Sequence, residues 1–482
     1  MKLGDLYGEY ALPRKSRLTP LAAAFFALFA WSTHDVQAAT WTVNNSGSGC
    51  GDGGGASGQG DLTKLTGNLR YATYFADPGD TVNIACSAIT LTQGSIIIDQ
   101  PNLTINGLPH NGLVITQTAQ DRVFYHHGTG KLSLSYMTLT GGDYYSTIGS
   151  YGGCIYSKGS VFLYATDVVS CKATSHGGDA HGGGVFTVGA LTMQNSLISG
   201  NSATATSGTN LNARGGGVFV EGDFASYYST VSGNSAKING ANEGRAGGLR
   251  LGHNVTIISS TISGNSAGQI VGGIDITSST PASLTAVISN STISGNHANY
   301  LGGLYVNSGT VTVNNTTIAF NTAAKGKLSG NTYAAGMAAD SNNAAMSVTL
   351  QSSLIANNTY GTTTQTPSDL TVVHTSAHAI AFNAAPANNL IFATSAAVPS
   401  DTLTSVCPLL APLADNGGFT WTHALLTKSP ALAKGNNKSN LTYDQRGPTY
   451  LRVATGESAP DIGAYEMQRT DIIFATGFEG CP

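Results

Sequence analysis

The chain has 482 residues and a formal net charge of −4, and only 10% of its residues are Asp, Glu, Lys or Arg. So few basic residues give no cationic stripe for phosphate groups, and we therefore expect no nucleic-acid partner. Glycine supplies 61 residues, and a chain of this length and composition suits one elongated repeat fold as well as several ordinary domains.

The N-terminus has the pattern of a secretory signal peptide. Arg14, Lys15 and Arg17 precede the apolar run 21–31, and small residues follow up to Ala38. This run of about 11 apolar residues is shorter than the ~20 that span a bilayer. We therefore expect a signal peptide at 1–38, a mature chain without a transmembrane segment, and a secreted or cell-surface protein.

Six cysteines form an even set, as in exported proteins with disulfides. None has the short spacing of metal-ligand pairs, so we expect no metal and no other cofactor. The pairing stays open, although Cys50 with Cys86 and Cys154 with Cys171 are nearest in the chain. The six are Cys50, Cys86, Cys154, Cys171, Cys407 and Cys481.

Residues 39–80 are predicted to form an N-terminal loop and cap. Leu62, Leu65, Leu69, Ala72 and Ala76 recur at near-helical spacing before Pro78-Gly79. Such a pattern predicts a short amphipathic helix. A helix at this place would cover strand edges that the first coil otherwise leaves unpaired.

Residues 81–360 carry an internal repeat, which is the mark of a solenoid. One half of the unit is a glycine turn followed by alternating apolar residues, as in 182–187, 215–220, 247–251, 272–276 and 302–306. The other half ends in Ser-Gly-Asn at Asn201, Asn234, Asn265 and Asn296, with degenerate copies ending at Asn321 and Asn358. The runs alternate with a period of two and lack a helical period, so each unit is predicted to be a set of short strands.

Stacking the units predicts an all-β fold, a right-handed parallel β-helix that forms a single solenoid with a short N-terminal helical cap. Equivalent strands would lie about 4.8 Å apart. Two apolar columns would then fill the interior. The first is Val185, Val218, Leu249, Ile274 and Leu304, and the second is Ile198, Val231, Ile262, Ile293, Ile318 and Ile355.

The asparagine column is interpreted as structural. Asparagine tolerates the left-handed backbone conformation of a tight bend, and stacked amide side chains can form hydrogen bonds from coil to coil.

Two further stretches resemble known protein families. Gly67-Asn68-Leu69-Arg70-Tyr71-Ala72, with Pro78-Gly79-Asp80, resembles the N-terminal cap of bacterial pectate-lyase-like β-helix surface proteins. Pro412 to Gly418, Trp421 to Leu426, Asp444 to Gly447 and Asp461 to Glu466 resemble the closing region of choice-of-anchor Q domain proteins. This resemblance implies C-terminal coils and a closing region at 361–470, with a tail at 471–482, and we expect the solenoid to continue through Ala424-Leu425-Leu426.

An outward column follows the first interior column by one residue. Phe186, Phe219, Arg250, Asp275 and Tyr305 occupy one position of successive coils. Ring faces with polar groups between them suit sugar rings, so these five residues are the candidate ligand-binding site. The competing interpretation is that such aromatic residues stack for stability. An alternative site on the loop rim comprises His176, Asp179, His181, Arg214, Glu243 and Arg245.

Catalytic residues cannot be assigned from these columns. A glycoside hydrolase needs two carboxylates at a defined separation, whereas the outward column holds one, beside an arginine. We therefore expect an adhesin-like or glycan-binding protein without catalysis, whose partner is a polysaccharide or cell-surface glycan. The alternative is a polysaccharide lyase or glycoside hydrolase that uses the outer face of the solenoid.

Overall fold

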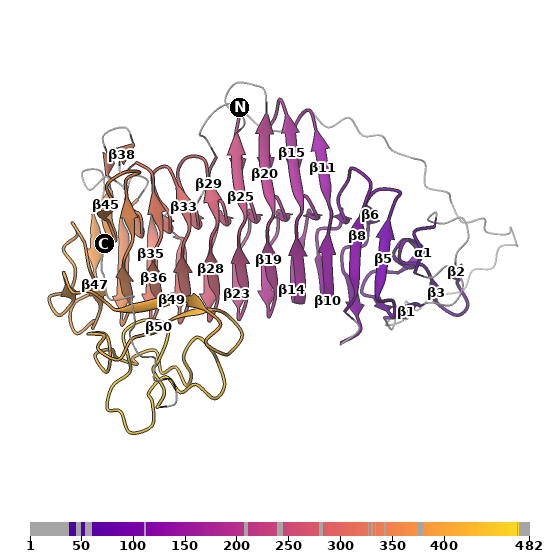
Figure 1. Ribbon diagram of the computed structural model, residues 1–482. Coiled ribbons are helices and arrows are strands. Elements are labelled where there is room, and N and C mark those ends of the chain that lie inside the picture. The colour runs from indigo at the N-terminus through magenta and orange to yellow at the C-terminus, as the bar shows by residue number, and fades with distance from the viewer. Residues whose placement is uncertain are drawn as a thin grey trace, which may run out of the picture. The chain divides into compact units, whose positions relative to one another are not determined.

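Stacked parallel coils make up most of the chain in the computed structural model (Figure 1). The structure describes residues 38–44, 50–53, 60–109, 112–206, 211–238, 244–278, 283–325, 327–328, 331–332, 334–341, 344–373, 379–469 and 471. The predicted signal peptide up to Gln37, Glu243 and the tail after Asp471 lie outside these residues.

Each regular coil passes through three core strands. In one coil these are β17 (Val185–Thr187), β18 (Leu191–Gln194) and β19 (Leu197–Ser199). Each strand pairs in parallel with its equivalent in the next coil, for example Val185 with Val218 and Ile198 with Val231. The predicted fold class, an all-β right-handed parallel β-helix, is therefore confirmed.

Three strand faces enclose the core. Sheet B consists of β6 (Ile96–Ile98), β9 (Phe124–His126), β13 (Ile155–Ser157), β17, β22 (Val218–Val220), β26 (Leu249–Leu251), β30 (Ile274–Ile276), β34 (Leu304–Val306), β40 (Met337–Asp340) and β45 (Leu370–Val373). The large sheet bends into two faces, which we call face A1 and face A2. The long strands β10 (Lys131–Thr140) and β14 (Ser160–Val169) run across both faces.

Face A1 also contains β1 (Thr40–Val43), β4 (Thr81–Ile84), β7 (Leu103–Gly107), β18, β23 (Phe224–Tyr227), β27 (Val255–Ile258), β31 (Thr285–Ser289), β35 (Gly309–Asn314), β41 (Met346–Gln351) and β46 (Ile380–Phe382). Face A2 also contains β5 (Ala88–Leu91), β8 (Val114–Gln117), β19, β24 (Thr230–Ser232), β28 (Thr261–Ser263), β32 (Thr292–Ser294), β36 (Thr317–Ala319), β42 (Leu354–Ala356), β47 (Leu390–Ile391) and β48 (Leu403–Thr404).

Both predicted interior columns are buried in this core. Val185, Val218, Leu249, Ile274 and Leu304 have no exposed surface, and the column that contains Ile198 and Ile262 is at most 1% exposed. Stacked aliphatic side chains of similar size fill the interior, so burial of apolar surface stabilises the coils.

The asparagine column forms a continuous hydrogen-bonded ladder. Asn234 Nδ2 donates to Asn265 Oδ1 at 2.9 Å, and the same contact repeats from Asn201 to Asn358. The ladder ends where Asn358 donates to the carboxylate of Asp369 at 2.8 Å. In the regular coils the left-handed conformation belongs to the glycine before each asparagine, with φ between 63° and 67°, and not to the asparagine itself.

A side lobe follows the asparagine turn. Sheet C comprises β11 (Asp143–Ser146), β15 (Lys172–His176), β20 (Ser202–Thr206), β25 (Ser235–Ile238), β29 (Ser266–Ala267), β33 (His297–Ala298), β37 (Thr322–Ala323), β43 (Thr359–Tyr360) and β44 (Thr366–Pro367). Sheet D comprises β12 (Ser150–Tyr151), β16 (Ala180–His181) and β21 (Ala213–Arg214). Small buried alanines fill the space between the two sheets, so the lobe packs closely.

The predicted N-terminal cap is a helix, α1 (Leu69–Phe75). It is shorter than its apolar spacing suggests, because Asn68 accepts the Tyr71 backbone N–H and caps the helix there. Leu62 and Leu65 therefore lie before the helix. Two disulfides, Cys50–Cys86 and Cys154–Cys171, connect neighbouring parts of the chain, and Cys407 is also disulfide-bonded.

The closing region turns back along the outer side of face A2. Its β49 (Leu410–Ala414) and β50 (Thr422–Leu425) pair antiparallel, so the expected continuation of parallel coils through Ala424–Leu426 is wrong. In Figure 1 the two strands and the yellow loops after them lie beside the row of stacked strands.

Hydroxyl groups of successive coils anchor this region. Thr261 donates to the Trp421 carbonyl at 2.6 Å, Thr292 donates to Gln445 at 2.6 Å, and Thr317 accepts the Ala464 backbone N–H at 3.0 Å. These contacts are made side by side along face A2.

Buried arginines organise the interior of the closing region. Arg446 pairs with Asp444 at 2.8 Å and lies between the rings of Tyr450 and Tyr465. Arg452 is fully buried and pairs with Glu466 at 3.1 Å. Hydrogen-bonded charges therefore add to the apolar cluster of Leu410, Leu425 and Ile462 in holding this region together.

Candidate functional site

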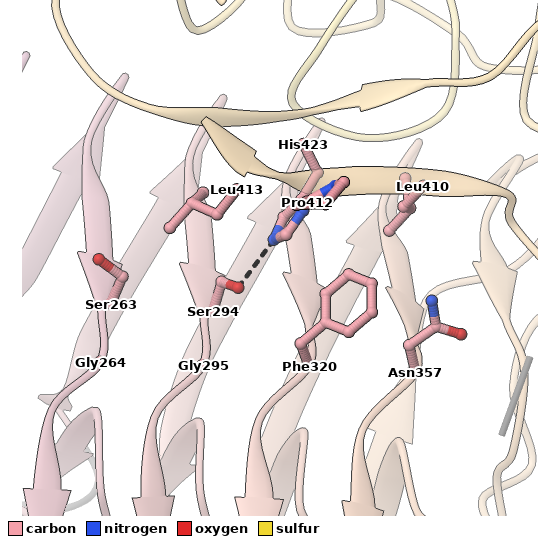
Figure 2. Close-up of a pocket in the computed structure, with 10 residues that line it drawn as sticks. All are labelled: Ser263, Gly264, Ser294, Gly295, Phe320, Asn357, Leu410, Pro412, Leu413 and His423. Carbon is pink, nitrogen blue, oxygen red and sulfur yellow. Dashed lines mark hydrogen bonds between the residues drawn. The ribbon is translucent and has the colours of Figure 1, made fainter. Parts of the chain in front are cut away.

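A cleft of about 740 Å³ lies between face A2 and the β49–β50 hairpin. Figure 2 shows the outer residues of four adjacent coils on one side and the hairpin on the other. The solenoid contributes hydroxyl and aromatic side chains, and the hairpin contributes apolar ones. The lining residues are Ser263, Gly264, Ser294, Gly295, Phe320, Asn357, Leu410, Pro412, Leu413 and His423.

His423 joins the hairpin to the solenoid at this cleft. Its Nδ1 lies 2.7 Å from the Ala411 carbonyl oxygen, which can only accept, so Nδ1 carries the proton. Its Nε2 therefore accepts from the Ser294 hydroxyl at 2.7 Å (Figure 2). Burial lowers the pKa of His423 to about 4, so the ring is neutral at pH 7.

A serine hydroxyl bonded to an oriented imidazole is the arrangement of an activated nucleophile. The neighbouring contacts of Thr261 and Thr292 with the closing region argue for a simpler role, because they are also hydroxyl bonds from face A2. His423 and Ser294 are both nearly completely buried. We therefore interpret this pair as an attachment point of the hairpin.

Acidification is expected to loosen the hairpin through His423. Its folded-state pKa of about 4 lies below the ordinary 6.5, so its stabilising contribution is present above pH 6.5 and is lost as the pH falls through 4. Between about pH 6.5 and pH 5 the loss is roughly 2 kcal/mol, at 1.36 kcal/mol per pH unit. Unfolding followed by Trp421 fluorescence in the wild type and in His423→Gln measures the difference; equal pH profiles of the two proteins would contradict this role.

Phe320 occupies a strained position at the cleft. It stands where four other coils have Gly200, Gly233, Gly264 and Gly295, and it keeps their left-handed conformation with φ 58°. A side chain in this region costs about 1–2 kcal/mol. Its ring contacts His423 with centroids 4.9 Å apart and remains 36% exposed. Retained strain of this kind favours a functional role for the ring.

The cleft continues along face A2 into a second hollow of about 460 Å³. Phe419 and Trp421 line it with 56% and 55% of their surfaces exposed. Tyr228 lies beside Phe419, with ring centroids 5.1 Å apart. Hydroxyl groups of Thr230 and other face A2 residues line the other side. The two hollows share Ser263 and Leu413, so they adjoin along face A2, and together they are called the groove below.

Asp167 places a carboxyl group in the same groove. It lines the second hollow and also a third of about 240 Å³, which extends toward Tyr136. Burial raises the pKa of Asp167, and the Leu197 backbone N–H partly opposes this. In the ladder of face A2 its neighbours are Thr138 and Leu197. The groove thus combines a carboxyl group with aromatic and hydroxyl groups.

The five residues of the predicted ligand-binding column do stack in successive coils, but they do not form an exposed strip. Phe186, Phe219, Arg250, Asp275 and Tyr305 pair in sequence across sheet B. Phe186 and Tyr305 are buried, and Asp275 has no exposed surface. The expected outward exposure of these three side chains is therefore wrong. Ligand binding by the column remains a prediction.

The side lobe covers this column with part of the predicted rim. The His181 ring stacks on Phe219 at 4.5 Å, and Arg245 pairs with Asp275 and lies over the Tyr305 ring. The two candidate sites of the sequence therefore meet in one cluster. Arg214 lies beside Arg245 in the next coil.

Of the two other described rim residues, Asp179 lies near this cluster, and His176 is exposed on the side lobe. Asp179 accepts hydrogen bonds from Asn212 and lies 3.8 Å from His181. His176 is exposed and lies 3.1 Å from the Thr206 hydroxyl. Among the described residues no group of three His, Cys, Asp or Glu side chains is placed to hold a metal ion.

The groove on face A2 was not singled out from the sequence. Phe320 could have been noticed, because it replaces the glycine of the repeat. Asp167 could also have been noticed, because the equivalent positions of face A2 in the neighbouring coils hold the uncharged residues Thr138 and Leu197. Phe419 and Trp421 carry no such signal, because their partner surface depends on how the closing region folds back.

Comparison with known proteins does not identify a function for this chain. No family model and no curated protein matches the chain. A solved structure described as pectate lyase Pel9A is similar over 89% of this chain and 96% of its own, with 16% sequence identity and a TM-score of 0.43. A similarity of this size carries no conclusion about activity. None of the described helices is long and apolar enough to cross a membrane.

Proposed function

We propose that this protein is a secreted or cell-surface β-helix protein that binds a polysaccharide chain in the groove of face A2. The observation that carries the proposal is the pair of half-exposed rings, Phe419 and Trp421, opposite a row of hydroxyl groups. Aromatic faces contact the apolar face of a sugar ring, and hydroxyl groups fix its orientation. The groove crosses several coils, which suits an extended chain.

The proposed location outside the cell rests on covalent structure. The Cys50–Cys86 and Cys154–Cys171 disulfides are typical of an oxidising compartment. The predicted signal peptide at 1–38 agrees with this, and so does the resemblance to choice-of-anchor Q proteins, which we retain as part of the proposal. An adhesin-like role is the form of binding that we favour.

Trp421→Ala and Phe419→Ala are expected to weaken polysaccharide binding at least fivefold each. Central aromatic side chains contribute about 1 kcal/mol or more to an interface, because alanine cannot supply their contact area. Affinity electrophoresis in gels that contain soluble pectin, xylan or alginate measures the change. Tyr74→Ala is the control, since its ring is 61% exposed on α1, outside the groove. Equal retardation of all three variants and the wild type would contradict the proposal.

Catalysis in the same groove is the second candidate, and Asp167 is the observation that favours it. A carboxyl group with a raised pKa can act as a general acid toward a glycosidic oxygen. A hydrolase or lyase would release reducing ends or unsaturated products from the same polysaccharides. Such products from the wild type, absent with Asp167→Asn, would establish an enzyme; their absence with retained binding supports the binding protein.

A further inference from the structure

Three guanidinium groups gather in the side-lobe cluster around one fully buried carboxylate. Arg245 pairs with Asp275 through a short bidentate contact. Arg250 Nε lies 3.6 Å from the same carboxylate. Arg214 adds a third positive charge, and among the described residues Asp275 and Asp179 are the carboxylates whose charges act on it.

Arg214 and Arg245 lie directly next to each other. Their backbones pair in parallel across adjacent coils, so the two side chains leave from the same ladder position. Burial lowers the pKa of Arg214 and the positive charge of Arg245 lowers it further, while the charges of Asp275 and Asp179 oppose this. Two like charges in a partly buried place repel each other strongly unless an anion balances them.

In the part of the chain that the structure describes, Arg245 is paired with Asp275, whereas the side-chain hydrogen bond of Arg214 goes to a neutral group. Arg214 Nη2 donates to the amide oxygen of Asn212 at 2.7 Å, which is neutral. Asp179 accepts hydrogen bonds from the backbone and side chain of the same Asn212 and lies 3.8 Å from His181. A partly buried guanidinium group whose hydrogen bond goes to a neutral amide favours an added acceptor.

A cavity opens at this pair. It has a volume of about 150 Å³, and Arg214, Arg245, Asn212 and Gln269 line it together with apolar residues such as Ile270. At ~30 Å³ per water molecule this is the space of about five waters. The cavity therefore accommodates one oxyanion group and not a whole chain of sugar rings.

We propose that Arg214 and Arg245 bind an oxyanion, a carboxylate or sulfate group, in this cavity. Guanidinium groups donate paired hydrogen bonds to two oxygen atoms of a planar carboxylate or of a tetrahedral sulfate. The site lies on the side lobe, does not involve the groove of face A2, and does not depend on the function proposed for that groove. The anion comes from an acidic polysaccharide or from free solution, and the chemistry of the site is the same for both.

Titration calorimetry at constant ionic strength tests the site with sodium sulfate, galacturonate and oligogalacturonate, and with neutral galactose for comparison. The wild type is expected to bind the anions and not galactose. Arg214→Gln is expected to weaken anion binding at least tenfold, and Arg214→Lys, which keeps the charge, is expected to weaken it less. Lys158→Gln is the charge-matched control, because Lys158 is an exposed cation outside the cavity.

The outcomes separate the source of the anion from the existence of the site. Oligogalacturonate binding more tightly than galacturonate, with the loss in Arg214→Gln, assigns the site to an acidic glycan. Sulfate binding with no gain for the oligomer assigns it to a free anion. Anion binding that Arg214→Gln leaves unchanged, or that Lys158→Gln reduces equally, overturns the proposal. Trp421→Ala should leave the binding of sulfate intact, which separates the site from the groove.

Discussion

Ile262→Asp is expected to unfold several coils and to lower the free energy of unfolding by at least about 4 kcal/mol. The substitution removes an aliphatic side chain from the interior column and places a carboxyl group where it has neither water nor a partner. Ile262 stacks between Val231 and Ile293. Because each coil is stabilised mainly by its neighbours, the loss spreads along the solenoid.

Urea unfolding followed by far-ultraviolet circular dichroism measures this effect. Thr310→Asp is the matched control: it adds the same charge to β35 at an exposed position. Surface changes of this kind usually alter stability by less than about 0.5 kcal/mol. An Ile262→Asp protein that unfolds at the wild-type urea concentration would mean that the column is not a tightly packed interior.

Arg452→Met is expected to detach much of the closing region, at a cost of about 3–5 kcal/mol. The substitution leaves Glu466 buried without its cation, and an unpaired buried charge is strongly destabilising. Arg452 also donates to the Gly463 carbonyl at 2.9 Å, and this bond would be lost. Hydrogen exchange of the backbone amides from Leu410 to Glu466 reports the detachment directly.

The effect of Arg452→Met should grow with pH. Burial raises the pKa of Glu466 to about 7 even with Arg452 present. Because the folded-state pKa of Glu466 lies above its ordinary pKa of 4.5, its contribution to the free energy of unfolding is fully present below pH 4.5. This contribution is lost as the pH rises through 7. Without the arginine the carboxylate is harder still to ionise, so the deficit relative to wild type is larger at about pH 8 than at about pH 6. Arg452→Met combined with Glu466→Gln should recover part of the stability, and a deficit independent of pH would exclude Glu466 as its cause.

The repeat makes the solenoid predictable. Columns such as Val185 to Leu304 follow from alternation and spacing, because each coil meets the same neighbours as the coil before it. The closing region has no repeat, and its position on face A2 depends on individual contacts such as Thr292 with Gln445. Single hydrogen bonds between residues far apart in the chain leave no periodic trace in the sequence.

The same distinction applies to the candidate sites. The register of Phe219, Arg250 and Asp275 was predictable, because it belongs to the repeat. Their burial was not, because it depends on the side lobe, whose loops vary in length from coil to coil. Arg245 and Asp275 are 30 residues apart, and their contact required the course of that lobe.

The contacts of the closing region also set a limit on how the number of coils can change. Thr261, Thr292 and Thr317 belong to three consecutive coils, and they bond to successive parts of one continuous segment, with Gln445 bonded to both Thr261 and Thr292. A coil inserted or deleted among them would put every later contact out of step with its partner. The described part of the closing region reaches along face A2 as far as Tyr228. Its contacts therefore do not fix the number of coils that come before Tyr228. The solenoid can therefore grow or shrink during evolution near its N-terminal end, while the coils beneath the closing region are held at a fixed number.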